Sequence, residues 1–123
     1  MIFVEGQSYT RQEINAQLGG EVQHYLPTSD GRIVCGCFNS KLNPEAPEII
    51  LAGNGPVIMK KAGMLCEQGG SIPVFMKRAV NGWEYVGFYK LTDWTESAEV
   101  IAHHSRQTRR DDISRVLYLK PVI

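Results

Sequence analysis

The sequence predicts an α+β domain in which a small, partly closed β-barrel is flanked by two short helices. Its 123 residues match the size of one compact domain, so residues 1–123 are expected to fold as a single unit. A content of 43% hydrophobic and 21% charged residues excludes wholesale disorder, and twelve glycines with six prolines favour short strands and frequent turns. Five or six strand patterns and two helical patterns, without regular alternation, indicate the α+β class.

The clearest local signal predicts a helix over 11–18. Thr10 and Glu13 have the spacing of a capping box, in which each side chain accepts a hydrogen bond from the other residue's backbone N–H. Apolar residues four apart give this helix one buried edge. Gly19-Gly20 then supplies a left-handed stop.

Strand patterns lie on both sides of this helix. Residues 2–4 are β-prone, 22–26 form a candidate strand, and 32–38 follow a Ser-Asp-Gly turn without any helical stripe. Two prolines predict a rigid loop over 42–47, because proline cannot donate to a β-ladder. Residues 48–52 have the apolar run of a buried strand.

A second helix is predicted over 57–68. The preceding turn, 53–56, ends in Pro56, and proline is favoured in the first turn of a helix. Apolar residues recur at helical spacing until Gly69-Gly70 ends the pattern.

A β-hairpin is predicted where residues 74–80 and 83–89 flank Asn81-Gly82. This dipeptide favours a two-residue type I′ turn, whose two central residues both have positive φ. Such a turn would set Val80 opposite Trp83. Both faces of this hairpin are apolar near the strand bases, as expected for central strands covered on each side.

The last third of the chain carries weaker signals. Residues 92–112 are polar and are expected to be irregular, whereas the alternating residues 114–119 predict a closing strand. No internal repeat or low-complexity tract is present.

Cysteine usage and hydropathy indicate a reducing cytoplasm. Three cysteines are an odd number, the first residues lack the pattern of a secretory signal, and no apolar run approaches the ~20 residues that span a bilayer. We therefore expect free thiols, a cytoplasmic location and no membrane partner.

Positive charge is concentrated in the second half of the chain. Thirteen basic and thirteen acidic residues cancel overall, yet residues 1–59 carry a net −3 and residues 60–123 a net +3. The basic residues of the second half that could form one phosphate-binding surface are Lys60, Lys61, Lys77, Arg78, Arg106, Arg109, Arg110 and Arg115. The alternative is an ordinary solvated surface on which Arg109 and Arg110 pair with Asp111 and Asp112.

Aromatic residues are the second candidate for nucleic-acid binding. Tyr25 beside a proline, or Trp83 beside the hairpin turn, could stack on a base lifted from a duplex. The alternative is that Trp83, Tyr85 and Tyr89 pack across neighbouring strands.

No motif for catalysis or for a cofactor is complete. Cys35 and Cys37 are too close for a zinc knuckle and lack a partner pair, so they are expected to be buried. The histidines belong to no nucleophile motif, and the 53–55 turn lacks the ending of a P-loop. We expect no metal and no cofactor, and the pattern favours a non-enzymatic role.

Several segments resemble, in this order, the SRA-like modified-DNA readers of the PUA-like superfamily, which occur beside HNH nuclease domains in methylation-dependent restriction enzymes. The segments that carry the resemblance are Tyr9–Ile14, Gly19–Gln23, Gly53-Asn54, Val74-Phe75 and Trp83–Gly87. The resemblance implies a β-barrel with crossing helices that flips a modified base into a pocket. It places Gln23 and Tyr25 on a loop bordering that pocket, Asn54 near its floor, and Trp83 and Tyr85 on its wall.

The first hypothesis is therefore a module that recognises a modified base, in DNA more readily than in RNA. The expected nucleic-acid-binding residues are Gln23, Tyr25, Asn54, Lys60, Lys61, Arg78, Trp83, Tyr85, Arg106, Arg109 and Arg110. We expect no HNH nuclease after Ile123, in which case cleavage would need a separate nuclease or effector protein. One alternative is a protein-interaction module, such as a phage or mobile-element inhibitor of a host enzyme. Another is a small nucleoside-processing enzyme that uses Lys77 and Glu84 as acid–base partners.

Overall fold

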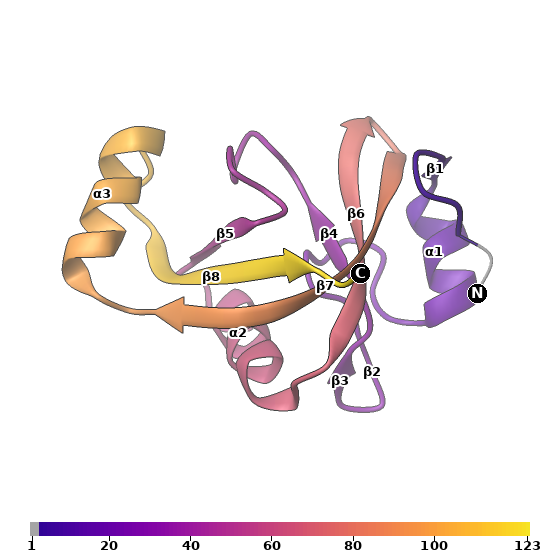
Figure 1. Ribbon diagram of the computed structural model, residues 1–123, viewed down its shortest axis with the longest axis horizontal. Coiled ribbons are helices and arrows are strands. Elements are labelled where there is room, and N and C mark those ends of the chain that lie inside the picture. The colour runs from indigo at the N-terminus through magenta and orange to yellow at the C-terminus, as the bar shows by residue number, and fades with distance from the viewer. Residues whose placement is uncertain (1–2) are drawn as a thin grey trace.

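The structure, a computed structural model, describes residues 3–123 and confirms the α+β class (Figure 1). The elements in chain order are β1 (Ser8–Tyr9), α1 (Arg11–Leu18), β2 (Thr28–Ser29), β3 (Arg32–Ile33), β4 (Gly36–Phe38), β5 (Ile49–Gly53), α2 (Pro56–Gln68), β6 (Ser71–Ala79), β7 (Gly82–Thr95), α3 (Ala98–Thr108) and β8 (Ile113–Pro121). Three helices are present in this range, where two were expected. None of these helices has the length and apolarity needed to span a bilayer.

The main sheet has the strand order β4-β6-β7-β8-β5, with β1 added to β7. β4 and β6 are parallel and every other pair is antiparallel. Within residues 3–123 no ladder joins β4 to β5, so the two ends of the sheet are not closed by hydrogen bonds into a barrel. β7 and β8 run side by side between α3 at one end of the longest axis and α1 at the other (Figure 1).

Helix α1 forms as its capping box predicts. The Glu13 backbone N–H donates to Thr10 Oγ1 at 3.1 Å, and the Thr10 N–H donates to Glu13 Oε1 at 2.8 Å. The helix ends at Gly19, whose φ of 79° favours glycine. Ile14 is 2% exposed and anchors the helix on the sheet.

The core divides between the two faces of the sheet. A larger cluster, which includes Leu65 of α2, Ile50 of β5 and Leu117 of β8, lies between α2 and the sheet. A smaller cluster around Phe75 and Tyr85 lies on the α1 side and includes both Cys35 and Cys37. The helices thus cover opposite faces, as expected for a central hairpin.

The strands expected early in the chain are partly wrong. Ile2 lies outside the described residues, and Phe3 and Val4 are not in a strand. Residues 22–26 form no strand, and the Arg11 guanidinium binds the backbone carbonyls of Glu21 and His24 in place of a neighbouring strand. Residues 32–38 are split into β3 and β4.

The later elements are largely confirmed. Residues 42–47 form the expected loop, β5 covers the expected 48–52 with a shift of one residue, and α2 begins at Pro56. β8 contains all of 114–119.

The hairpin is confirmed, but its turn type and register are wrong. The two-residue loop is Val80-Asn81, and neither Asn81 nor Gly82 has a positive φ. Trp83 therefore pairs with Lys77, and not with Val80. The turn differs because the Asn81 side chain bonds to α1: its Oδ1 accepts from the Arg11 N–H at 3.0 Å, and its Nδ2 donates to the Gln12 side chain at 2.9 Å.

The expectation of an irregular segment over 92–112 is wrong. β7 continues to Thr95, and α3 follows with Ser97 as its N-cap, whose side chain accepts from the Val100 N–H. Val100 and Ile101 pack against the cluster that contains Val116, which gives the helix a buried edge despite its polar composition. Arg109, with φ of 60°, ends it.

Candidate functional site

A cavity of about 380 Å³ opens between α2, β5 and three loops. Its lining residues are Gln23, His24, Tyr25, Leu42, Asn43, Leu51, Ala52, Gly53, Val57, Ile58, Lys61, Arg110 and Asp112. Most of this lining is apolar, with a few polar groups, and the volume lies within the ~300–1,000 Å³ of small-molecule sites. We call this space the first cavity.

One wall is the segment 21–25, which two buried cations hold in place. Arg11, 6% exposed, donates from Nη2 to the carbonyl oxygens of Glu21 at 3.0 Å and His24 at 2.7 Å. Lys61, 5% exposed, donates to Glu21 Oε1 at 2.7 Å. Partial burial raises the pKa of Glu21, but hydrogen bonds from Lys61 and Thr28 outweigh it and lower this pKa to about 2.

Tyr25 is fixed by a hydrogen bond to α2. Its hydroxyl donates to the Ile58 carbonyl at 2.7 Å. Burial raises the pKa of this phenol, so the ring is neutral at ordinary pH. Tyr25 therefore contributes a rigid, uncharged aromatic wall.

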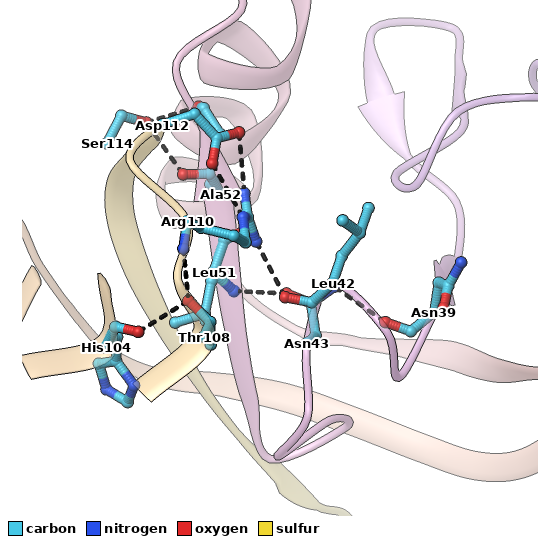
Figure 2. A network of polar contacts seen from close by, with 11 residues as sticks. Asn39, Leu42, Asn43, Leu51, Ala52, His104, Thr108, Arg110, Asp112 and Ser114 are labelled. Carbon is cyan, nitrogen blue, oxygen red and sulfur yellow. Dashed lines mark hydrogen bonds and ion pairs between the residues drawn. The ribbon is translucent and has the colours of Figure 1, made fainter. Parts of the chain in front are cut away.

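Arg110 organises the opposite wall (Figure 2). Its guanidinium grips the Asp112 carboxylate with two hydrogen bonds, of 2.9 and 3.1 Å. Its Nη1 also donates to the carbonyls of Leu42, at 2.9 Å, and Leu51, at 3.1 Å. This pairing holds the pKa of Asp112 below its usual value. The charge of Arg110 is thus neutralised locally.

Asn43 completes this wall. It is 6% exposed, and its Oδ1 accepts from the Leu51 N–H at 2.7 Å, which ties the 42–47 loop to β5 (Figure 2). Ser114 donates to the Gly53 carbonyl at 2.7 Å from the other side.

Gly53 lines the cavity close to the Asp112 carboxylate. A Cβ there would lie 2.8 Å from Asp112 Oδ2. Any larger residue would push the carboxylate away from Arg110.

The structure brings some of the expected site residues together. Gln23, Tyr25, Lys61 and Arg110 all line the first cavity. Asn54 is exposed and directly follows the lining residue Gly53.

The other expected residues lie elsewhere. Trp83 lines a neighbouring cavity, and Tyr85, 5% exposed, is packed in the smaller core cluster. Lys60 is exposed on α2, and Arg78, near the hairpin tip, pairs with Glu84 at 2.8 Å.

The expected basic residues are split between distant elements. Arg106 belongs to α3 and Arg109 caps it. The hairpin tip that carries Arg78 contacts α1, at the other end of the longest axis (Figure 1). The basic side chains of the second half therefore do not share one surface.

Sequence reasoning missed the apolar rim of the cavity. Leu42, Val57 and Ile58 are 54%, 52% and 38% exposed. The sequence does carry a signal for exposed apolar residues on this helix. Residues 57–59 are three successive apolar residues, and one helix cannot turn all three toward the core. Asp112 was considered only as a surface partner of arginine.

The cysteines lie away from this cavity's lining. Cys35 and Cys37 are buried with their sulfur atoms 3.9 Å apart, and the hydrogen bond between them together with burial raises the pKa of Cys35. Within residues 3–123 no cluster of three His, Cys, Asp or Glu side chains could hold a metal ion.

Fold and cavity together define a class of small α+β domain, with helices on both faces of the sheet and a mostly apolar cavity beside the edge strand β5. The chain belongs to the family described as "Domain of unknown function (DUF6697)", which matches residues 8–117. No curated protein shows significant sequence similarity to it.

One solved structure shares the fold. The Type IV phosphorothioation-dependent restriction endonuclease ScoMcrA superposes with a TM-score of 0.54 at 15% identity. The match covers 97% of this chain and 28% of the endonuclease chain, so the chain corresponds to about a quarter of that protein.

Proposed function

We propose that this chain is a nucleic-acid-binding domain that recognises a modified base, in DNA more readily than in RNA, by accepting it in the first cavity. The observation that carries the proposal is the first cavity itself. It has a volume of about 380 Å³ and a mostly apolar lining that includes the ring of Tyr25 and the exposed amide of Gln23. The shared fold with a phosphorothioation-dependent restriction endonuclease supports a nucleic-acid-binding role in general. The recognition of a base is supported by the cavity and by the resemblance to SRA-like readers.

The lining has the chemistry that an unstacked base requires. The face of Tyr25 and the rim residues Leu42 and Ile58 offer apolar contact to a flat ring. The Gln23 amide has both donors and an acceptor, and the Asp112 carboxylate keeps lone pairs beyond the two that Arg110 occupies. These groups would read the hydrogen-bonding edge of a flipped base and favour the base over bulk water.

The proposed setting is a restriction system in which this domain recognises modified DNA and a nuclease cleaves it. The endonuclease with the shared fold is more than three times as long, leaving most of its chain outside the match. A nuclease or effector is the proposed partner.

An affinity panel tests the proposal. Duplexes with one central cytosine or adenine modification, a phosphorothioate duplex and plain duplexes would be titrated by fluorescence anisotropy at two salt concentrations. We expect one base modification to bind at least tenfold more tightly than the plain duplex. Gln23→Ala should reduce this preference, whereas Gln107→Ala, an exposed glutamine of α3, should retain it.

Equal affinity for every duplex in the panel would contradict base recognition. A preference for the phosphorothioate duplex alone would also contradict it, because that modification leaves the bases unchanged.

A further inference from the structure

A second cavity, of about 430 Å³, adjoins the first. Its lining residues are Arg11, Gln12, Val22, Gln23, His24, Tyr25, Cys37, Asn39, Leu42, Lys77, Val80, Asn81 and Trp83. It shares Gln23, His24, Tyr25 and Leu42 with the first cavity, so residues 23–25 form a common wall.

The charged lining of the second cavity is entirely positive. Arg11 and Lys77 line it, and no carboxylate does. The guanidinium of Arg11 is bound to two backbone carbonyls, whereas Lys77 makes no ion pair within residues 3–123. In the first cavity, by contrast, Lys61 and Arg110 are each neutralised by a carboxylate.

Trp83 adds an unused hydrogen-bond donor to this wall. The residue is 8% exposed, and its Nε1 is buried without a partner among residues 3–123. Arg11 lies 5.0 Å from the ring centroid and the Lys77 ammonium 5.8 Å from it. A buried donor left without an acceptor is unfavourable, and an anionic oxygen that reached this N–H would remove that cost.

We propose that the second cavity is a phosphate subsite, which binds a phosphodiester group of the strand whose base enters the first cavity. Lys77 supplies the uncompensated charge and Trp83 a hydrogen-bond donor. The shared wall at residues 23–25 would bring a base and a neighbouring phosphate of one nucleotide strand into the two cavities. This assignment rests on the proposed function.

Inorganic phosphate tests the subsite without any nucleic acid. In ¹⁵N-labelled protein we expect the indole N–H signal of Trp83 to shift during a phosphate titration, relative to sodium chloride of equal ionic strength. Trp94, at the far end of β7, should stay unchanged as an internal reference. Lys77→Gln should weaken the response at least tenfold, and Lys90→Gln, an exposed lysine of the same sheet, should preserve it.

A Trp83 signal that moves no more than that of Trp94 would overturn the subsite. So would a full response in Lys77→Gln.

A duplex titration then links the subsite to the proposed function. With the tightest-binding modified duplex of the panel, Lys77→Gln should lower affinity about five- to tenfold and reduce the slope of log affinity against log salt by about 1. The ratio of affinities for modified and plain duplexes should stay the same. Unchanged affinity in Lys77→Gln would overturn the subsite and leave base recognition standing. Equal affinity of the unaltered protein for modified and plain duplexes would overturn base recognition. The phosphate titration would then still decide whether the subsite exists.

Discussion

At the scale of single residues, position in the sequence does not reveal which charges are free. Lys61 was expected to contact phosphate, yet Glu21 pairs with it inside the protein. For Arg110 the sequence left two alternatives, phosphate contact or pairing with the neighbouring aspartates, and the structure shows a pair with Asp112. Arg11, a residue given no charged role from the sequence, is buried and fixes the wall between the two cavities. Pairing partners such as Glu21 and Lys61 are 40 positions apart, so no local pattern identifies them.

The Glu21–Lys61 pair predicts an acid-dependent loss of stability. The pKa of Glu21 is lowered from 4.5 to about 2, so its carboxylate stabilises the folded state above pH 4.5 and loses this contribution as the pH falls toward 2. Because the Glu21 side chain is 39% exposed, solvent screening reduces the contribution to about 1 kcal/mol. We expect the free energy of unfolding, measured with urea between pH 5 and pH 2, to fall less steeply in Lys61→Met than in the unaltered protein.

Lys60→Met is the matched control, since Lys60 is an exposed neighbour without an ion pair within residues 3–123. It should reproduce the profile of the unaltered protein. Parallel profiles for Lys61→Met and the unaltered protein would show that this pair does not set the pKa of Glu21.

At the scale of elements, local signals succeed where the cause is local. The capping box of α1 and the proline at the start of α2 act within one turn of chain, and both helices begin where these residues predict. The predicted turn type of the hairpin is wrong because the Asn81 side chain forms hydrogen bonds to α1, about 70 residues earlier in the chain. The sequence analysis did not predict helix α3, because most of its residues are polar or charged. Its Ser97 N-cap and its short apolar edge, which packs against the core, are weak signals by themselves.

The link between hairpin and α1 can be tested at Asn81. Asn81→Ala removes a hydrogen bond to the Arg11 N–H and another to the Gln12 side chain. We expect a loss of about 1 kcal/mol in the free energy of unfolding, since such bonds contribute roughly 0.5–1.5 kcal/mol each and the site is exposed. Urea unfolding at pH 7 measures it. Val80→Ala, at the adjacent tip residue that is 93% exposed, should leave stability unchanged, and equal stability of the two variants would refute the link.

At the scale of the whole molecule, the cavities combine segments that are far apart in the sequence. The first cavity joins residues 23–25, 42–43 and 51–53 with Val57, Ile58 and Lys61 of α2 and with Arg110 and Asp112. Of its lining, Gln23, Tyr25, Lys61 and Arg110 were expected as site residues from the sequence. The remainder depends on which loops meet at the edge strand β5, and that follows from the strand order β4-β6-β7-β8-β5. Composition and short motifs do not determine such an order.

The distribution of charge over the molecule predicts a weak salt dependence of DNA binding. The formal charge is zero, and of the basic side chains Lys61, Arg78, Arg110 and Arg115 are paired with carboxylates. Few cations remain near the cavities, and each neutralised phosphate contributes about 0.9 to the salt slope. We therefore expect log affinity for a modified duplex to fall with log salt at a slope of about −1 to −2. Fluorescence anisotropy at salt concentrations between roughly 50 and 200 mM measures this slope. Arg106→Gln, on α3, should not alter it. A slope of about −5 or steeper would instead mean that the basic residues of the second half act together on the phosphate backbone, and that binding is dominated by charge and not by the cavities.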